Sequence, residues 1–206
     1  MDEQAIALRE LGSEIAACPK CELAKTRTHA VPGEGSPNAE IVFIGEGPGF
    51  YEDQQARPFV GPAGKFLDEL LASIGLRRQD VYICNVIKCR PPGNRDPLPG
   101  EIAACKPWLD RQLEIISPKV IVTLGRFSLG RYFPGQSISR IHGQPKKVDG
   151  LVVVPMYHPA AALHQGSLRR TIEQDFLKLP ELLKQALKAK APVEERAPEP
   201  IQMQLL

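Results

Sequence analysis

The sequence predicts an α/β fold in which helices cover both faces of a parallel sheet. Four short runs rich in valine and isoleucine have the length and composition of strands that are buried on both sides. Helical segments separate these runs, and an alternation of strands and helices is typical of parallel sheets. The predicted strands are residues 41–44, 81–84, 120–124 and 151–154.

Four segments carry the spacing of apolar residues that indicates an amphipathic helix. Gly75 follows the second of them and Pro118 lies beyond the end of the third, and both residue types commonly end a helix. The predicted helices are residues 2–17, 65–74, about 101–116 and about 171–188.

Length and composition exclude several classes of protein. The chain has 206 residues, 43% hydrophobic and 24% charged, which is enough for a sizeable core. No apolar run approaches the ~18 residues of a membrane span. The N-terminus carries acidic residues instead of the basic region and apolar core of a secretory signal. The five cysteines are an odd number, so we expect reduced thiols or metal ligands in a cytoplasmic protein.

The composition changes near the C-terminus, where proline and polar residues replace the apolar periodicity. Such a segment has too few apolar side chains to form a core of its own. We therefore predict that residues 1–190 form the folded domain and residues 191–206 a disordered tail.

The formal net charge of +2 conceals a local excess of basic residues. Between Ile115 and Ile172 there are eight lysines and arginines and one acid, Asp149, so this stretch carries +7 and the rest of the chain −5. This separation is compatible with a polyanionic partner such as nucleic acid, although basic patches also serve solubility alone.

Polar motifs follow three of the predicted strands at the points where these strands end. The sequence GEGPG occupies residues 45–49 after the first strand, Asn85 follows the second, and His158 follows the last. Ligands of open α/β sheets bind beyond the carboxyl ends of the strands, so we expect these motifs to form one active site.

Four cysteines are candidates for metal ligands. Cys18 and Cys21 are separated by two residues in a predicted loop, a spacing that lets two thiolates reach one metal centre. Cys89 and Cys105 could complete a set that binds zinc or an iron–sulfur cluster, and the spacing does not decide between them. Cys84 lies inside an apolar strand, where we expect a small core residue.

Four motifs, in order along the chain, resemble the family 4 uracil-DNA glycosylases of bacteria and archaea. They are GEGPG at 45–49, RPFVGPAG at 57–64, YICNVIKCRPPGNRDPLPGEIAAC at 82–105 and YHPAAALH at 157–164. The resemblance covers about residues 10–188. It implies a three-layer α/β/α domain with a central four-stranded parallel sheet. It also implies a [4Fe–4S] cluster whose ligands fall on Cys18, Cys21, Cys89 and Cys105.

The resemblance further implies a pocket for uracil. Gly45, Glu46 and Gly47 would surround the base, and Phe59 would lie flat on it. Asn85 would bind the polar edge of uracil, because its amide presents a donor beside an acceptor and matches a carbonyl next to a ring N–H. Cytosine presents the opposite pattern at this edge, and a buried mismatch would reject it.

His158 would donate a hydrogen bond to the uracil oxygen on which negative charge builds as the base leaves. Other uracil glycosylases have an acidic or amide side chain where this chain has Gly47, so the water-activating group lies elsewhere. We expect Glu52 in this role, with Glu46 and Asp53 as the other nearby carboxylates. Glu52 could instead form a wall that excludes the methyl group of thymine.

Uracil within a duplex is accessible only after base flipping. We expect Leu163 to enter the vacated stack, and Arg169 and Arg170 to bind flanking phosphates. Arg90 and Arg95, in the proline-rich loop, could also contact the DNA backbone.

A related branch of these enzymes bonds covalently to DNA through a histidine in a loop after the asparagine motif. The loop that follows Asn85 here lacks that histidine, and the similar sequence Arg140-Ile141-His142 lies elsewhere in the chain. We therefore expect turnover and not covalent trapping.

The expected activity releases free uracil from single- or double-stranded DNA and leaves an abasic site. We expect a cytoplasmic, nucleoid-associated monomer without membrane contact. Residues Gln202 to Leu206 resemble, in part, the short peptide with which bacterial repair proteins dock on the replication sliding clamp. The clamp is therefore a candidate partner, and the alternative is a terminus that binds nothing.

Two other functions stay open at this stage. One is a non-catalytic or redox-active iron–sulfur protein that binds nucleic acid. The other is a nucleotide-binding module with GEGPG as its phosphate loop, although the sequence lacks the lysine of a P-loop. Release of free uracil without added metal or nucleotide distinguishes the glycosylase from both.

Overall fold

The computed structural model describes residues 2–188, and the predicted α/β fold is confirmed there. The sheet has six strands in the order β1-β3-β2-β4-β6-β5. Its four central strands are parallel and coincide with the predicted ones: β3 (Tyr82–Asn85), β2 (Ile41–Gly45), β4 (Val120–Leu124) and β6 (Leu151–Met156).

Two short edge strands extend the predicted four-stranded sheet to six. Both pair antiparallel to their neighbours: β1 (Glu34–Gly35) with β3, and β5 (Lys146–Val148) with β6. The sequence gives little sign of them, because they are only two and three residues long and largely polar.

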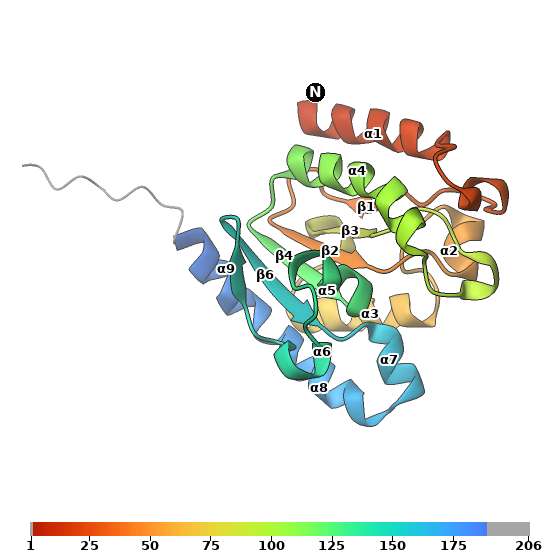
Figure 1. The fold of residues 1–206 in the computed structure, drawn as a ribbon. Coiled ribbons are helices and arrows are strands. Elements are labelled where there is room, and N and C mark those ends of the chain that lie inside the picture. The colour runs from red at the N-terminus through yellow and green to blue at the C-terminus, as the bar shows by residue number, and fades with distance from the viewer. Residues whose placement is uncertain (1, 189–206) are drawn as a thin grey trace, which may run out of the picture.

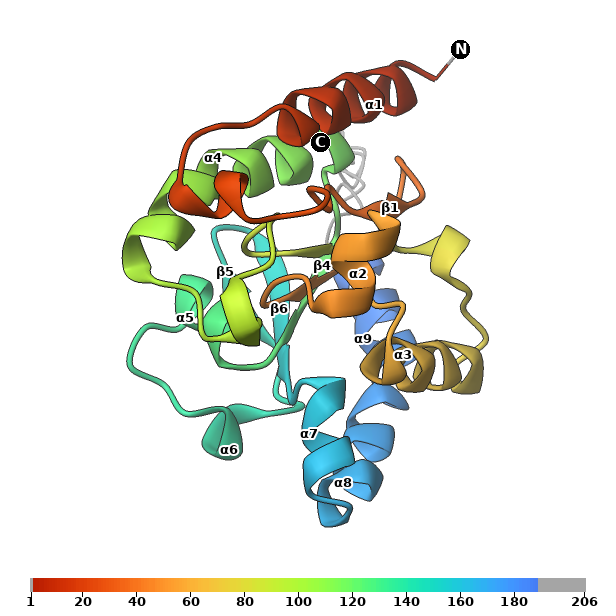
Figure 2. The same cartoon turned by 90° about the vertical axis from the view of Figure 1, so that its right-hand side faces the viewer.

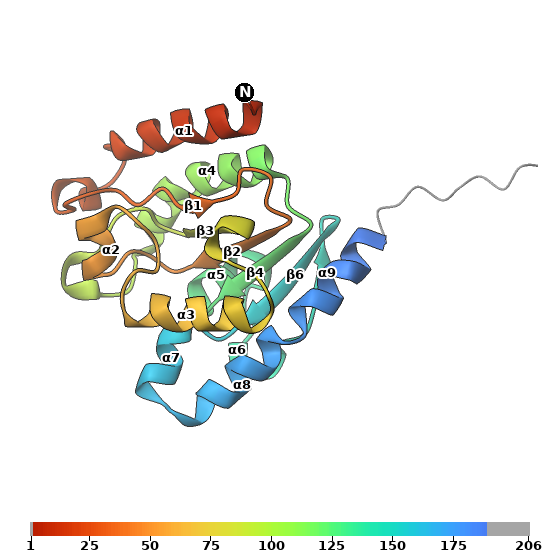
Figure 3. The same ribbon diagram turned by 180° about the vertical axis from the view of Figure 1, so that it is seen from behind.

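Helices cover both faces of the sheet, which produces the three expected layers (Figures 1 and 3). One face carries α1 (Glu3–Ala16), α4 (Pro99–Ile116) and α5 (Arg126–Tyr132). The opposite face carries α3 (Pro62–Ser73), α8 (Ser167–Phe176) and α9 (Leu179–Lys188). The shorter helical elements are η1 (Glu22–Lys25), α2 (Phe50–Gln55), η2 (Arg78–Asp80), η3 (Pro92–Asn94), α6 (Ile138–Ile141) and α7 (Pro159–His164).

Each central strand contributes to two cores, because successive side chains of a strand point to opposite faces. In β2, Val42 and Ile44 pack towards α1 and α4, whereas Ile41 and Phe43 pack towards α3 and α8. The ring of Phe43 stacks on Phe176 of α8, with the ring centroids 5.8 Å apart. Burial on both faces explains why these strands are continuous apolar runs.

Two helices begin earlier than predicted, in each case at a proline. α3 begins at Pro62 and α4 at Pro99, whereas the predicted starts were residue 65 and about residue 101. Proline suits the first position of a helix, because its φ is already helical and its missing N–H has no partner to lose there.

The last predicted helix, residues 171–188, is two helices in the structure. α8 ends at Phe176, and α9 begins at Leu179 with Pro180 as its second residue. Pro180 thus falls in the first turn of α9, where the missing N–H of a proline has no partner to lose.

The carboxyl ends of the parallel strands meet at one end of the molecule, where α2 follows β2, η3 follows β3 and α7 follows β6. Figure 2 shows α2 and α7 at this end. Among residues 2–188, no helix has both the length and the apolar character needed to cross a membrane. The predicted tail, residues 191–206, and its clamp-binding peptide lie outside the described residues.

Candidate active site

A cavity of about 480 Å³ lies at the carboxyl ends of the strands, where the sequence predicted a site. Its volume is in the range of small-molecule sites. Most of the predicted pocket residues line it: Glu46, Gly47, Glu52, Phe59, Asn85 and His158. Folding therefore brings together side chains from four separate segments of the chain.

Gly45 lies at the point where two of these side chains converge. A Cβ atom on Gly45 would stand 2.4 Å from Oδ1 of Asn85 and 2.6 Å from the ring of Phe59. Neither distance is physically possible, so any larger residue would push the amide or the ring out of place. Gly45 thus serves the pocket by leaving room for its neighbours.

Phe59 is held in an unusual backbone conformation. Its φ of +53° lies in the left-handed region, which is unfavourable for a phenylalanine. Arg78 stabilises this turn by donating hydrogen bonds to the carbonyls of Phe59, at 2.9 Å, and of Pro58. Gly64 packs so closely on the Phe59 carbonyl that a Cβ atom would lie 1.8 Å from its oxygen. The surrounding structure therefore determines where the ring stands.

His158 is prepared as a neutral hydrogen-bond donor. Its Nδ1 accepts a hydrogen bond from the backbone N–H of Ala160 at 3.1 Å, so a neutral ring carries its proton on Nε2. Burial lowers the pKa of His158 to about 4, although the charge of Glu52 acts in the opposite direction. The ring also stacks near Phe59, with centroids 5.4 Å apart.

Glu52, the predicted water-activating residue, has both carboxylate oxygens bonded to the backbone. One oxygen accepts hydrogen bonds from the N–H groups of Val60 and Gly61, both at 2.9 Å, and the other from Gly49 at 3.1 Å. Three such bonds engage both oxygens of the carboxylate and fix its orientation. They also join the GEGPG turn to the loop that carries Phe59.

Glu46 differs from Glu52 in its surroundings. It lines the cavity half-buried, and no hydrogen bond holds its carboxylate within residues 2–188. Burial, and secondly the charge of Asp96, raises the pKa of Glu46. Asp53, the third nearby carboxylate, is 2% exposed and accepts hydrogen bonds from the backbone of Thr28 and His29, away from the cavity.

The four candidate cysteine ligands line a second, smaller pocket. Three of their sulfurs accept hydrogen bonds: Cys89 from the Arg27 guanidinium at 3.0 Å, Cys18 from the Trp108 indole at 3.2 Å, and Cys105 from the backbone N–H of Lys88 at 3.2 Å. Cys84 lies apart from this pocket, fully buried in β3.

The donor set of this second pocket fits an iron–sulfur cluster. Four cysteines with N–H donors directed at the sulfurs are the usual surroundings of such clusters. Within residues 2–188, no three His, Cys, Asp or Glu side chains stand close enough to hold a single metal ion. Burial raises the pKa of Cys105 to about 11, so metal binding would have to displace a proton there.

The three predicted DNA contacts stand in different environments. Leu163 is 50% exposed at the end of α7. Arg169 forms ion pairs with Glu69 at 2.6 Å and Glu173 at 3.0 Å. Arg170 is exposed and forms no ion pair with the described residues. Of the two arginines, Arg170 is therefore the more available to a phosphate.

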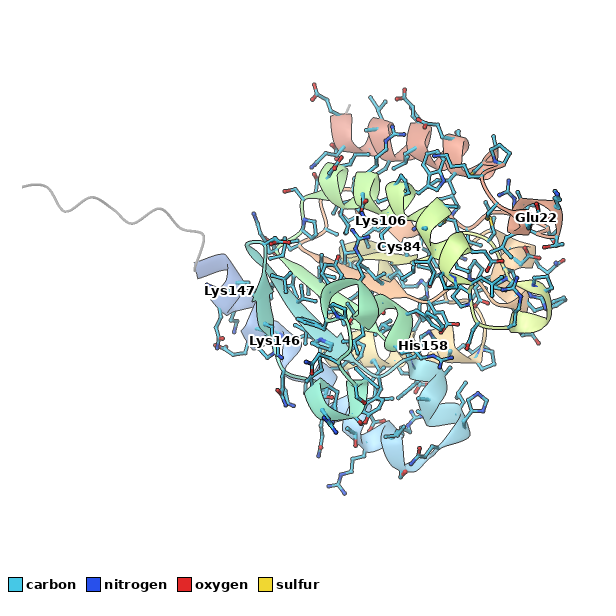
Figure 4. All side chains as sticks on the ribbon, viewed as in Figure 1. Glu22, Cys84, Lys106, Lys146, Lys147 and His158 are labelled. Atoms are coloured by element: carbon cyan, nitrogen blue, oxygen red, sulfur yellow. The ribbon has the colours of Figure 1, made fainter. Side chains whose placement is uncertain are left out.

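The basic stretch of the sequence does not form one positive face around the cavity. Arg126 and Arg131 form ion pairs with acids from elsewhere in the chain, Asp96 and Asp110. Lys146 and Lys147 lie on the edge strand β5, well away from His158 (Figure 4). The charge excess of the stretch is thus divided between several surfaces.

The histidine of the Arg140-Ile141-His142 sequence lies outside the cavity. Its Nδ1 is 2.6 Å from a carboxylate oxygen of Asp175, and its ring packs against Tyr157. These contacts connect the end of α6 with α8, so this histidine contributes to the packing of the fold and not to the cavity.

Several residues of the two pockets were not predicted. Ile87 and Ala160 line the cavity, and Arg27 and Trp108 donate hydrogen bonds to the cysteines. Ile87 and Ala160 are close in sequence to Asn85 and His158, and this proximity could have indicated that they line the same cavity. Trp108 lies 90 residues from Cys18 in the chain, and only the fold brings the two together.

Comparisons with known proteins agree with this geometry. A family profile described as "Uracil DNA glycosylase superfamily" matches residues 32–186. Proteins named type-4 uracil-DNA glycosylase are similar over most of the chain. The one from Archaeoglobus fulgidus is 51% identical over 185 residues, which cover 85% of this chain and 93% of the relative.

Two further type-4 relatives give the same result. The protein from Sulfurisphaera tokodaii is 50% identical, with 85% of this chain and 84% of the relative covered. The protein from Thermotoga maritima is 48% identical, with 86% and 95% covered. With a family match over most of its length and relatives at about half identity, the chain belongs to the uracil DNA glycosylase superfamily and resembles its type-4 members.

Proposed function

We propose that this protein removes uracil from DNA by hydrolysing the N-glycosidic bond, which releases the free base and leaves an abasic site. The observation that carries the proposal is the convergence of Phe59, Asn85 and His158 on one cavity at the carboxyl ends of the strands. The family membership and the names of the relatives agree with it.

Recognition of uracil is assigned to Asn85 and Phe59. The ring of Phe59 supplies a flat apolar surface for the pyrimidine. The amide of Asn85, 2% exposed at the end of β3, supplies one donor and one acceptor side by side. Cytosine would place its amino group against the donor of this amide. A buried site of this kind discriminates by ~10⁴ or more.

Departure of the base is assisted by His158. The Nε2–H of its neutral ring donates to the oxygen on which negative charge accumulates, and a preorganised donor of this kind lowers a barrier by ~3–4 kcal/mol. The neutral ring keeps its Nε2 proton and acts as a hydrogen-bond donor, not as an acid that transfers a proton. Uracil leaves as an anion, and the base itself requires no protonation.

Glu46 is the better placed of the two pocket carboxylates to orient and deprotonate the attacking water. A carboxylate with a raised pKa is a stronger base than an ordinary one, and that of Glu46 is not engaged by other hydrogen bonds within residues 2–188. Glu52 instead holds the loops of the pocket through its three backbone hydrogen bonds.

The two carboxylates are distinguished by paired variants. Glu46→Gln should lower the single-turnover excision rate at least tenfold while the thermal unfolding temperature stays near that of the wild type. Glu52→Gln should lower the unfolding temperature, because a neutral amide cannot replace the three charge-assisted bonds. A rate loss confined to Glu52→Gln in a protein of normal stability would return the water-activating role to Glu52.

The DNA surface is assigned to the rim formed by α7 and the start of α8. Leu163 would enter the space left by the flipped nucleotide, and Arg170 would bind a flanking phosphate. Arg169 would contribute less, because two carboxylates already hold it.

A [4Fe–4S] cluster is proposed at Cys18, Cys21, Cys89 and Cys105. Support comes from their common pocket and from the three N–H donors directed at the sulfurs. When bound, the cluster would supply a covalent connection between the N-terminal loop, the segment after β3 and α4. It is not assigned a step in hydrolysis.

The test is an assay of uracil release from single-stranded and double-stranded oligonucleotides that contain one uracil. Matched oligonucleotides with cytosine or thymine at that position serve as controls. Release of free uracil without added metal or nucleotide is the expected result. Tight DNA binding without release would favour the alternative, a non-catalytic or redox-active iron–sulfur protein that binds nucleic acid.

A further inference from the structure

Lys88 is a buried cation in the short segment between the uracil pocket and the cysteine pocket. Its side chain is 1% exposed, although lysine is almost never fully buried unless it is paired. Nζ donates hydrogen bonds to the backbone carbonyl of Asn85 at 2.8 Å and to Oε1 of Gln112 at 2.6 Å. The steps assigned above to the pocket do not use this side chain.

Neither of these two acceptors carries a charge. Among the described residues, no carboxylate oxygen lies within the 4.0 Å of an ion pair from Nζ of Lys88. An ammonium group that is taken out of water without an anion is strongly unfavourable. The fold must therefore provide Lys88 with negative charge of another kind.

The cysteine pocket lies next to Lys88, and its thiols become anionic when they bind a metal. The backbone N–H of Lys88 donates to Sγ of Cys105 at 3.2 Å, and Cys89 is the next residue in the chain. Lys88 and the cysteine ligands also line the same small pocket. A [4Fe–4S] cluster with four thiolates carries net negative charge, because the sulfides and thiolates outweigh the irons.

Gln112 keeps the lysine in this orientation. Its Nε2 donates to the carbonyl of Pro32 at 2.8 Å and to the hydroxyl of Tyr82 at 3.1 Å, so its amide oxygen is the atom that faces Lys88. Gln112 is 1% exposed, so this network lies in the interior of the protein. Buried polar networks of this kind are rigid when every member is bonded.

We propose that Lys88 is a positioning residue that couples the cluster to uracil recognition, because one ammonium group both takes its counter-charge from the cluster and holds the backbone of Asn85. The inference rests on the proposed cluster and on the proposed role of Asn85. The cluster then does more than connect segments of the chain. Without its charge, an uncompensated cation would stand at the residue that recognises the base.

The experiment replaces Lys88 by methionine, which keeps the length of the side chain and removes its charge. Lys88→Met should shift the reduction potential of the cluster, measured by voltammetry, to a more negative value, because a nearby cation stabilises the reduced form. It should also weaken inhibition by free uracil about tenfold or more, because the Asn85 carbonyl loses its buried partner. A purely structural lysine would not move the potential.

The matched control is Lys106→Met. Lys106 is adjacent to Cys105, but its side chain is 60% exposed and pairs with Asp110 at 2.6 Å. Its removal should leave both the potential and the inhibition by uracil unchanged. An equal shift in Lys106→Met and Lys88→Met would mean that the cluster responds to overall charge, and it would overturn the inference.

A second variant, Gln112→Glu, tests the charge without removing Lys88. The new carboxylate would neutralise the ammonium in place, so the potential should shift in the same negative direction while inhibition by uracil is largely retained. An unchanged potential in this variant overturns the inference even where Lys88→Met does not fold. A shifted potential with unchanged inhibition by uracil in Lys88→Met overturns the coupling. A colourless, iron-free wild-type protein overturns the cluster proposal itself, and the inference with it.

Discussion

The two pockets on either side of residues 85–89 are held together by different kinds of bond. In the larger cavity, polar side chains bind the backbone of their own loops, as Glu52 does with three N–H groups and His158 with one. In the cysteine pocket, the hydrogen bonds run from nitrogen donors such as Arg27 and Trp108 to sulfur.

This difference distinguishes a cavity that the polypeptide shapes by itself from a pocket that the proposed cluster would complete. The larger cavity is shaped by the polypeptide, so a substitution of Asn85 or His158, which are assigned to the base, should change excision and leave the fold intact. In the cysteine pocket, burial raises the pKa of Cys89 and Cys105, so the proposed cluster would have to displace their protons. A substitution there should change stability first, and the predictions below test this division.

The largest effect is expected from Asn85→Ala and His158→Ala. Each should lower the rate of uracil excision by ~10²–10⁴, because each removes a contact to the base that strengthens in the transition state. Iron content and the unfolding temperature should stay close to those of the wild type. Single-turnover assays and thermal unfolding measure the two quantities.

Asn94→Ala is the control for this pair. Asn94 lines the same cavity but is exposed in η3, where its amide oxygen accepts a hydrogen bond from Arg90 at 2.7 Å. We expect less than a tenfold change in rate. Near wild-type rates for Asn85→Ala and His158→Ala would contradict the assignment of the pocket.

The second effect concerns the cysteine pocket. Substitution of Cys105 by alanine should abolish the brown colour, reduce bound iron and lower the unfolding temperature, because the N-terminal loop is no longer connected to α4. Cys84→Ala should keep the colour, since Cys84 lies in β3 outside this pocket. Iron analysis measures the bound iron, and thermal unfolding measures the loss of stability. A colourless Cys84→Ala protein would show that the ligand set is misassigned.

The positions of the strands and of the pocket motifs could be predicted from the sequence for a simple physical reason. A strand that is buried on both faces needs a continuous apolar run, and residues 41–44 and 120–124 are such runs. The polar residues that follow them have to lie at the ends of the strands. Asn85 and His158 follow the other two strands of this kind, so the sequence predicts that they share one active site with GEGPG.

Other features depend on contacts that periodicity does not encode. The break between α8 and α9 lies just before Pro180, and the apolar spacing of residues 171–188 does not indicate it. Nothing in the sequence indicates the burial of Lys88, whose ammonium group bonds to Gln112 of α4 in the folded protein. The engagement of Glu52 by three backbone N–H groups is likewise a property of the folded loops.

The third effect is a pH dependence of the larger cavity. An ordinary histidine changes its charge near pH 6.5, but the lowered pKa of His158, about 4, keeps its ring neutral well below that value. Excision should therefore show no loss centred near pH 6.5. The first loss on acidification should come from Glu46, whose pKa is raised above its ordinary value.

The stability of the folded protein should also depend on the protonation of His158, and its lowered pKa determines the direction. The unfolded chain takes up a proton on His158 near pH 6.5, and the folded protein does so only near pH 4. The contribution of this group to stability is therefore complete above pH 6.5 and declines as the pH falls towards 4. Rate profiles of the wild type and Glu46→Gln between about pH 4.5 and about pH 8 check the assignment, and a midpoint near 6.5 in both would show a solvated His158.

The smallest effect distinguishes the two arginines at the DNA-facing rim. Arg170→Ala should weaken DNA binding and reduce the slope of log affinity against log salt concentration by about one, as expected for the loss of one phosphate contact. Arg169→Ala should change this slope less. Its guanidinium already forms ion pairs with Glu69 and Glu173, and it lies 4.3 Å from the ring centroid of Phe66.

Binding titrations over a series of salt concentrations, with a catalytically inactive background such as Asn85→Ala, measure both slopes on intact DNA. Equal slopes for Arg169→Ala and Arg170→Ala would mean that the ion pairs of Arg169 open when DNA binds. The cost of opening exposed pairs is small, at most about 1 kcal/mol each, so affinity alone does not separate the two cases. The slope does, because it counts the phosphate charges that are neutralised in the complex and not the energy of each contact.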